Sequence, residues 1–181
     1  MDFAALSQQC REPGGSGLEG FIRDERVGVL GWPDDVVEQW LYDFGGWSRF
    51  HADYGHLDLT TIEWGDDLVD AEQFLTMPTG PSDVDLIDEN AANAAHWSEA
   101  RRHLGVPQHW ESHGTWIRRP ILVERSLLYS EGAGLQVIEG RTRVGVLRGF
   151  MRQGRKVAAT HAAWVGRRRL TVESDTVAVV R

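Results

Sequence analysis

The sequence of 181 residues has a single cysteine and no apolar run approaching the roughly 20 residues that a membrane-spanning helix needs. One cysteine, Cys10, excludes an intramolecular disulfide and any zinc site built on several thiolates. The chain begins Met1-Asp2-Phe3, without the basic region of a secretory signal peptide. We therefore expect a cytoplasmic protein that makes no membrane contact.

Lysine is almost missing as well, because Lys156 is the only lysine among the 19 basic residues. An anion site in this chain must therefore use arginine, whose planar guanidinium binds phosphate oxygens in a fork. Residues 1–100 hold 21 acidic residues against 4 arginines, whereas residues 101–181 hold 15 basic against 6 acidic residues. The asymmetry predicts that the two halves pack together and offset their charges. The alternative is an acidic half that binds a basic protein partner.

The pattern along the chain predicts a flexible tail and one domain. Residues 1–20 contain a Gly-rich stretch typical of a tail, and residues 21–116 indicate an acidic, mostly helical part. In that part we expect a short strand or extended segment at 21–30, a helix at 33–44, a strand at 57–64, a helix at 69–77 and one from 83 or 85 to 103 or 104. In the core, 117–181, we expect strands at 117–123, 135–138, 157–165 and 170–180 and a helix at 141–151. The order predicts an α+β or α/β fold with a small mixed sheet.

The strongest functional signal is the junction at Glu139-Gly140, where an apolar strand ends and a helix begins at once. Glycine permits a sharp turn and a close approach of a ligand to the backbone. The first helical amides lack intrahelical acceptors and point beyond the helix end, where the dipole favours an anion. Thr142 adds a hydroxyl, and Arg141 and Arg143 add guanidinium groups. The pattern predicts a phosphate site at residues 140–143; the alternative is surface arginines that face water.

Residues 117–166 contain Arg119-Pro120-Ile121-Leu122-Val123, then a turn, and then Gly140-Arg141-Thr142-Arg143 before an apolar helix. This segment resembles the core of the ParB/sulfiredoxin-like superfamily. Members of that family arrange a strand, a hairpin, a Gly-x-x-Arg loop, a helix and another strand in this order. The resemblance implies that Gly140 and Arg143 contact the phosphates of a nucleotide, ATP or CTP with Mg²⁺. It argues against sulfinic acid reduction, because Arg141 stands where the reductases carry their catalytic cysteine. We also expect no chromosome-partition role, because few residues follow Gly166.

Three further residues are candidates for the same site. Glu139 is a candidate Mg²⁺ ligand or general base, with pairing to a neighbouring arginine as the alternative. His161, on the strand after the helix, is the second catalytic candidate; the alternative is a histidine of the core. Trp116 ends a segment rich in histidine and tryptophan and is a candidate base-stacking wall. Its alternative role is an aromatic plug that joins the two halves.

Metal binding is not expected. His109 and His113 are four residues apart, but they lack the carboxylate of a motif such as His-Glu-x-x-His. The acidic cluster Asp66, Asp67 and Asp70 is more typical of a solvated turn than of a metal site.

These observations favour a protein that binds a nucleotide or a phosphorylated small molecule. If it is an enzyme, phosphoryl transfer or phosphoester hydrolysis is the expected reaction, because an anion site stabilises developing phosphate charge. One alternative is a non-enzymatic interaction or regulatory protein that uses its acidic half. A weaker alternative is single-stranded nucleic-acid binding through the arginines and Trp116.

Overall fold

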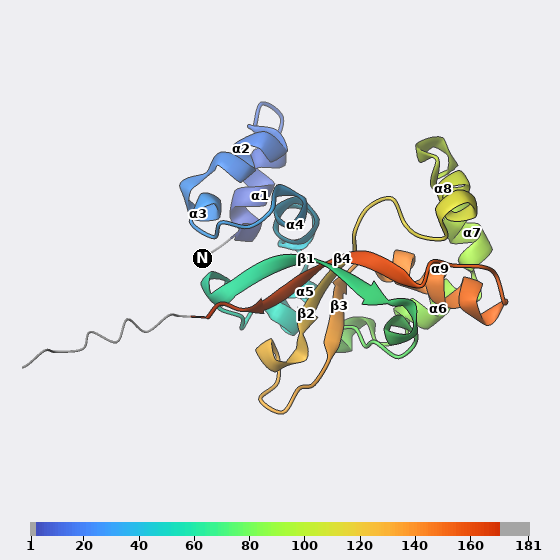
Figure 1. Cartoon of the computed structure of the whole chain (residues 1–181). Helices are drawn as coiled ribbons and strands as arrows, with labels where there is room; N and C mark the ends of the chain where they lie inside the picture. The colour runs from blue at the N-terminus through green and yellow to red at the C-terminus, as the bar shows by residue number, and fades with distance from the viewer. Residues whose placement is uncertain (1–2, 171–181) are drawn as a thin grey trace, which may run out of the picture.

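The computed structural model describes residues 3–170 and contains a four-stranded mixed sheet with helices on both faces (Figure 1). The strands are β1 (Ile62–Asp70), β2 (Ile121–Glu124), β3 (Leu135–Glu139) and β4 (Thr160–Arg168), in the spatial order β1-β4-β2-β3. β2 and β4 are parallel, and the two outer pairings are antiparallel. Helix α9 (Arg141–Arg152) carries the chain from β3 across to β4. The predicted α+β fold with a small mixed sheet is confirmed.

The chain before the sheet is helical. Its elements are α1 (Phe3–Arg11), α2 (Gly17–Arg23), α3 (Glu25–Gly28), α4 (Asp34–Val36), the π-helix η1 (Val37–Tyr42) and α5 (Ser48–Tyr54). The expected tail over residues 1–20 is wrong for α1, because Phe3, Leu6 and Cys10 are buried and the Ser7 hydroxyl donates to the Tyr42 carbonyl at 2.6 Å. The short strand or extended segment expected at 21–30 is also wrong, because most of these residues lie in α2 and α3. The helix expected at 33–44 is confirmed as α4 and η1.

The later connections contain short helices. They are η2 (Leu59–Thr61), η3 (Ala71–Leu75), η4 (Pro81–Asp83), α6 (Leu86–Ala92), α7 (Ala94–Glu99), η5 (Arg102–Leu104), α8 (Val106–His113) and η6 (Arg125–Leu127). The long helix expected up to 103 or 104 is therefore broken at Asn93, and the strand expected at 57–64 begins only at Ile62. The strand expected at 170–180 lies almost wholly outside the described residues. Within residues 3–170, no helix has the length and apolar character needed to cross a bilayer.

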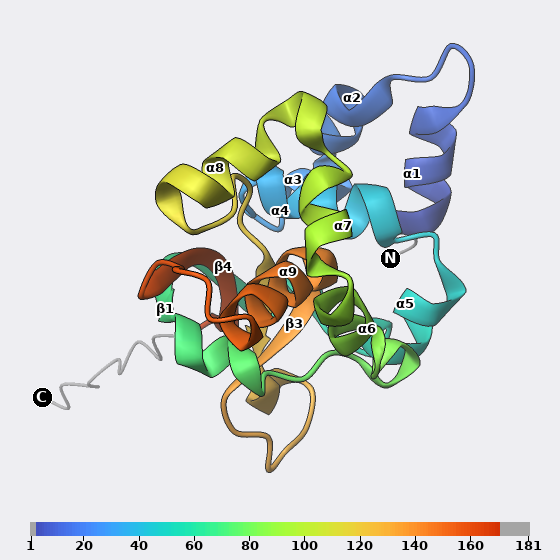
Figure 2. The ribbon, with the colours of Figure 1, turned by 90° about the vertical axis from the view of Figure 1, so that its right-hand side faces the viewer.

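The two faces of the sheet belong to two separate hydrophobic cores. Ile121 and Val123 pack with the N-terminal helices, whereas Leu122 and Val137 pack with α6, α8 and α9. The alternation follows from the strand period of two residues, which sends neighbouring side chains to opposite faces. Figure 2 shows α9 in front of the strands, with α6 and α7 beside it. The N-terminal helices and the sheet thus form one packed unit.

Ion pairs join the acidic first half to the arginines of the second half. Seven such contacts occur among the described residues: Arg118–Asp35, Arg118–Glu38, Arg119–Asp66, Arg141–Asp83, Arg148–Asp88, Arg152–Asp88 and Arg167–Asp67. The prediction that the two halves offset their charges is confirmed for these residues. Asp66 and Asp67 lie in β1 rather than in a turn, and each has an arginine partner.

The two edge strands of the sheet differ in their neighbours and in their charge. Beside β3, the Val137 amide donates to the Pro78 carbonyl at 2.8 Å, and the Thr79 hydroxyl donates to the Val137 carbonyl at 3.1 Å. The opposite edge is β1, which carries four acidic residues, Glu63, Asp66, Asp67 and Asp70.

Candidate functional site

A cavity of about 660 Å³ opens at the N-terminus of α9. Its walls come from η1, from the region of α7 and η5, from residues 116–118 and from the junction of β3 with α9. This volume lies within the range of roughly 300–1,000 Å³ that is typical of small-molecule sites. Five of the seven predicted site residues line it: Glu139, Gly140, Thr142, Arg143 and Trp116. The other two, Arg141 and His161, are not part of its lining.

Gly140 fixes the geometry of the junction. Its φ is +97°, a left-handed conformation, and a Cβ at this position would lie 2.6 Å from Cβ of Pro120. Only glycine fits both conditions without strain. The first backbone hydrogen bond of α9 runs from the Val144 amide to the Gly140 carbonyl at 2.9 Å. The amides of residues 141–143 donate to no other described residue, as is usual for the first turn of a helix.

Arg143 is held in place by three parts of the chain. Its Nη2 donates to Oε1 of Gln39 at 2.7 Å, and its Nη1 donates to the carbonyls of Arg118 and Arg119 at 3.3 Å. Glu139 lies 3.3 Å away, and the Arg143 side chain keeps 21% of its surface exposed. Burial lowers the pKa of Arg143 below its ordinary value, and the Glu139 carboxylate opposes this shift. The guanidinium is therefore a fixed cation in the cavity wall.

Arg141 and Glu139 form a structural ion-pair cluster. Arg141 contacts Asp83 at 2.8 Å and Glu139 at 3.4 Å, and its side chain is only 12% exposed. The two carboxylate oxygens of Glu139 are shared between Arg141 and Arg143. Glu139 thus has the alternative role considered for it, because it pairs with its neighbouring arginines. Arg141 is turned away from the cavity, so its guanidinium orients the loop instead of lining the site.

His161 lies in the core rather than at the cavity surface. It is 1% exposed, its Nδ1 lies 2.8 Å from the Thr115 hydroxyl, and its Nε2 has no hydrogen-bond partner among the described residues. Burial lowers its pKa to about 4, so the ring is neutral at pH 7. The ring of Trp116 packs against it at 4.7 Å, and the Trp116 indole donates to the Ala162 carbonyl at 2.7 Å. Trp116 is therefore a fixed wall of the cavity that also joins it to the core.

Two basic residues of the cavity, Arg101 and Arg118, are not among the residues predicted from the sequence. Arg118 contacts Asp35 and Glu38, both at 2.6 Å. Burial lowers the pKa of Arg118, but the hydrogen bonds with these carboxylates outweigh burial and raise it. Arg101 forms no ion pair with any residue between 3 and 170. The available signals were weak: Arg118 directly precedes a predicted strand, and Arg101 lies near the end of a predicted helix.

The rim of the cavity is apolar. Trp97, Leu104 and Ile117 are 38%, 55% and 52% exposed, which is unusual for large hydrophobic side chains, and all three line this one cavity. A group of exposed apolar residues around a concave site is typical of a ligand-binding surface. The cavity thus combines arginines and a helix N-terminus with an apolar rim.

Carboxylates are few at this site. Asp43 and Glu139 line the cavity, and both are engaged with arginines, Asp43 with Arg11 at 2.8 Å. Among residues 3–170, no three histidine, cysteine, aspartate or glutamate side chains are grouped so as to hold a metal ion. The His109 and His113 rings stack at 4.3 Å, and burial lowers the pKa of His109.

The chain matches no protein-family model, no curated protein and no solved structure. The resemblance of residues 117–166 to the ParB/sulfiredoxin-like superfamily therefore stays a prediction. The strand, hairpin, Gly-x-x-Arg loop, helix and strand that it implies occur in that order, as β2, β3, residues 140–143, α9 and β4.

Proposed function

We propose that this protein binds a nucleotide or a phosphorylated small molecule in the cavity at the N-terminus of α9. The observation that carries the proposal is the convergence of one free helix N-terminus with three arginines in a single cavity. The phosphate would lie against the amides of residues 141–143 and the Thr142 hydroxyl, beside Arg143.

The charges of the lining support an anionic ligand. Arg101, Arg118 and Arg143 face two carboxylates, Asp43 and Glu139, and the helix end adds partial positive charge. Arg118 and Arg143 are already oriented by protein partners, so a ligand would not need to order them. Arg101 is exposed and has no carboxylate partner in the described chain. It is therefore the arginine most available to a phosphate.

The apolar rim supports a ligand with a planar ring. Trp97 lies on the rim and Arg101 is four residues further along the chain. An exposed indole stacks well on a nucleobase, and such stacking tolerates any base. A nucleotide would place its phosphates at α9 and its base on Trp97. Such a nucleotide would contact both the arginines and the apolar rim of the cavity.

The proposal concerns binding and includes no reaction. Mg²⁺ is commonly held by phosphates together with one or two carboxylates, and Glu139 and Asp43 are the carboxylates that an ion carried by ATP or CTP would meet. Glu139 is held by two arginines and His161 does not line the cavity, so neither supports a catalytic step in this geometry.

The test is calorimetric titration with ATP, CTP, GTP and pyrophosphate, with and without Mg²⁺. The key variant is Arg101→Gln, and its matched control is Arg102→Gln, because Arg102 is exposed, pairs with Glu99 and does not line the cavity. Loss of a charge-assisted hydrogen bond at an exposed site should weaken phosphate binding about tenfold in the first variant. The second variant should bind as the wild type does.

A second pair of variants tests the base. Trp97→Ala should weaken nucleotide binding and leave pyrophosphate binding unchanged, whereas Trp47→Ala, an exposed tryptophan outside the cavity, should change neither. The proposal fails if the folded wild type binds none of the four ligands, or if Arg101→Gln and Arg102→Gln reduce affinity equally.

A further inference from the structure

Half of the backbone groups of β1 point away from the sheet. Two hydrogen bonds at the ends of the strand identify which half. The Arg169 amide donates to the Thr61 carbonyl at 2.7 Å, and the Ala71 amide donates to the Ala159 carbonyl at 2.9 Å. The antiparallel register with β4 is continuous between these two bonds, and hydrogen-bonded and non-bonded pairs alternate along such a ladder. The odd-numbered residues of β1 therefore bond to β4, and the even-numbered residues direct N–H and C=O outwards.

The N-terminal half of the protein covers only the start of this outer edge. The Ile62 carbonyl, which points outwards, accepts a hydrogen bond from the Trp32 indole at 3.3 Å. Beyond Ile62, β1 pairs with β4 alone, and no residue between 3 and 170 donates to or accepts from the outward backbone groups of the remaining even-numbered residues. These residues are Trp64, Asp66, Leu68 and Asp70. They form an open edge of four N–H and four C=O groups.

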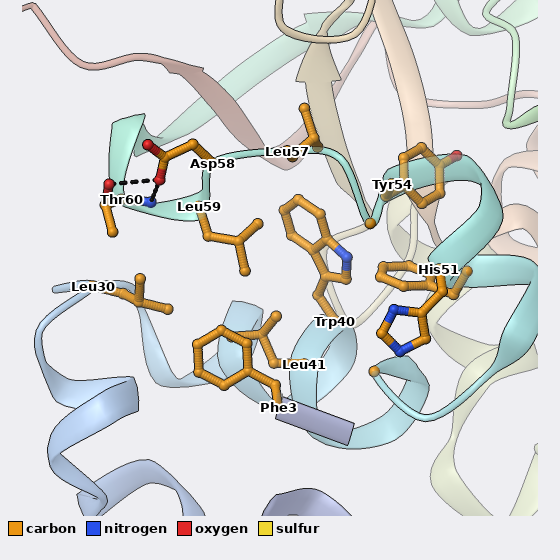
Figure 3. Close-up of a pocket in the computed structure, with 13 residues that line it drawn as sticks. Phe3, Leu30, Trp40, Leu41, His51, Tyr54, Leu57, Asp58, Leu59 and Thr60 are labelled. Atoms are coloured by element: carbon orange, nitrogen blue, oxygen red, sulfur yellow. Dashed lines mark hydrogen bonds between the residues drawn. The ribbon is translucent and has the colours of Figure 1, made fainter. Parts of the chain in front are cut away.

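The segment 57–60, which leads into β1, belongs to the N-terminal core. Figure 3 shows Leu59 pointing toward Leu41 of η1, while the Asp58 carboxylate accepts from the amide and the hydroxyl of Thr60. This segment also lines a cavity of about 210 Å³, which is open to solvent at the exposed residues Asp58 and Thr60. The start of β1 is thus fixed by packing on the N-terminal helices.

The open edge has the geometry of a site for a further strand. β1 has nine residues, with no proline and no bulge in its register. Sheet edges that stay unpaired are usually short, bulged or covered, and the open edge of β1 has none of these features. An extended peptide can add to such an edge through backbone hydrogen bonds, while its side chains pair with those of the edge strand.

Leu68 lies in the middle of the open edge and lacks an apolar neighbour. Its side chain is 72% exposed, and the residue opposite it in β4 is the small Ala162. Cross-strand side-chain pairs contribute to the stability of a sheet. An added strand would therefore gain from an apolar side chain beside Leu68.

Charge indicates the rest of the partner. Glu63 and Asp70, near the two ends of β1, and Glu72 just after it form no ion pair with an arginine among the described residues. Arg167 lies opposite Glu63 in β4, but its guanidinium contacts two other carboxylates, those of Asp67 and Glu124. A strand with basic side chains beside Glu63 and Asp70 would complement these charges.

We propose that the open edge of β1 binds an extended, basic segment of another protein, which adds to the sheet as a fifth strand. In antiparallel pairing, the segment places basic side chains beside Asp70 and Glu63 and an apolar side chain beside Leu68. Its backbone supplies partners for the outward groups of the even-numbered residues. This surface is separate from the phosphate site proposed above, because no residue of β1 lines the cavity at α9.

The test uses a peptide that matches residues 63–70 in length, with a lysine at each end and threonine alternating with valine between them. One control peptide has glutamate at each end. The other is the lysine peptide N-methylated at its valines, whose N–H groups would face β1. The lysine peptide should bind about tenfold more tightly than either control, because the controls lose the charge pairs or the backbone hydrogen bonds. The amide resonances of Trp64, Asp66, Leu68 and Asp70 should shift and exchange more slowly with solvent.

Variants of the edge test the same contacts from the side of the protein. Leu68→Pro removes an outward N–H without removing a bond to β4, so it should weaken the lysine peptide about tenfold. The matched control Leu68→Thr keeps the N–H and should bind within about threefold of the wild type. Glu63→Lys combined with Asp70→Lys should reverse the preference between the lysine and glutamate peptides. If Leu68→Pro does not fold, the N-methylated peptide still tests the backbone contacts on the wild type.

Several outcomes would overturn the proposal. The folded wild type would fail to bind the lysine peptide, or would bind the N-methylated or the glutamate peptide as tightly. Amide shifts confined to residues outside β1 would place the peptide elsewhere. Shifts of the β1 amides with protein concentration alone would identify a second copy of the chain, instead of a basic partner, as the occupant of this edge.

Discussion

Acid should destabilise this protein through one histidine, His161. The residue is 1% exposed and its pKa is lowered to about 4 by burial, whereas an unfolded histidine has a pKa of about 6.5. The unfolded chain therefore binds a proton over a range in which the folded chain does not. The contribution of the neutral ring to stability is fully present above pH 6.5 and is lost as the pH falls from 6.5 towards 4.

The magnitude follows from the width of that window. One pKa unit corresponds to about 1.4 kcal/mol, so the lowered pKa predicts a loss of roughly 2 kcal/mol between pH 7.5 and pH 5 and roughly 3 kcal/mol by pH 4. The assay is urea unfolding at a series of pH values. His161→Phe keeps an aromatic ring against Trp116 and Phe74 but cannot be protonated, so this part of the pH dependence should disappear.

The control for this prediction is an exposed histidine. His56→Gln should keep the wild-type dependence on pH, because His56 is exposed to solvent. His161→Phe also changes the stability at pH 7.5, because it removes the contact with Thr115 and the buried Nε2 that has no partner. Only the change with pH tests the argument. If the wild type and His161→Phe lose the same free energy between pH 7.5 and pH 5, the assignment of acid sensitivity to His161 is refuted.

Three substitutions test the packing. Gly140→Ala should destabilise the fold by about 2 kcal/mol in urea unfolding, because its φ is positive and the new Cβ would meet Pro120; no loss would show that the junction relaxes. Arg148→Met should cost about 3 kcal/mol, because the buried guanidinium donates to two backbone carbonyls, whereas the exposed control Arg152→Met should cost less than about 1 kcal/mol. Leu6→Ala should cost about 2–4 kcal/mol if α1 belongs to the core, and almost nothing if it is a tail.

The regular, apolar elements of the second half were predictable from the sequence. The strands near 121 and 135, the helix from Arg141 and the strand near 160 each have a clear period or a run of β-branched residues. The first half was harder for two reasons. The Gly-rich stretch at 12–17 favours a tail over residues 1–20, although the helical spacing of Phe3, Leu6 and Cys10 indicates α1. The strand β1 buries little more than Ile62 and Val69 and carries charged side chains elsewhere, so it lacks the alternation that identifies a strand.

Only the part of the site that is contiguous in the sequence could be predicted. Residues 139–143 are contiguous, and the turn chemistry of Gly140 indicates a helix start without any tertiary information. The partners of these residues are far away in the sequence. Gln39 lies 104 positions before Arg143, and Asp83 lies 58 positions before Arg141. No periodic pattern encodes such contacts. The roles of Arg141 and His161 therefore depended on packing that the sequence does not show.

The different chemistry at the two edges of the sheet bears on aggregation. An exposed strand edge is a template on which a strand from another copy can pair, and natural proteins block it with charge or with covering segments. Here the β3 edge is occupied at Val137 by Pro78 and Thr79. A copy approaching β1 would bring its own Glu63 and Asp70 against those of the first molecule, and these two carboxylates form no ion pair with an arginine among the described residues, unlike Asp66 and Asp67. Growth of the sheet from one molecule into the next is thus opposed at both ends, by occupancy at one and by repulsion at the other.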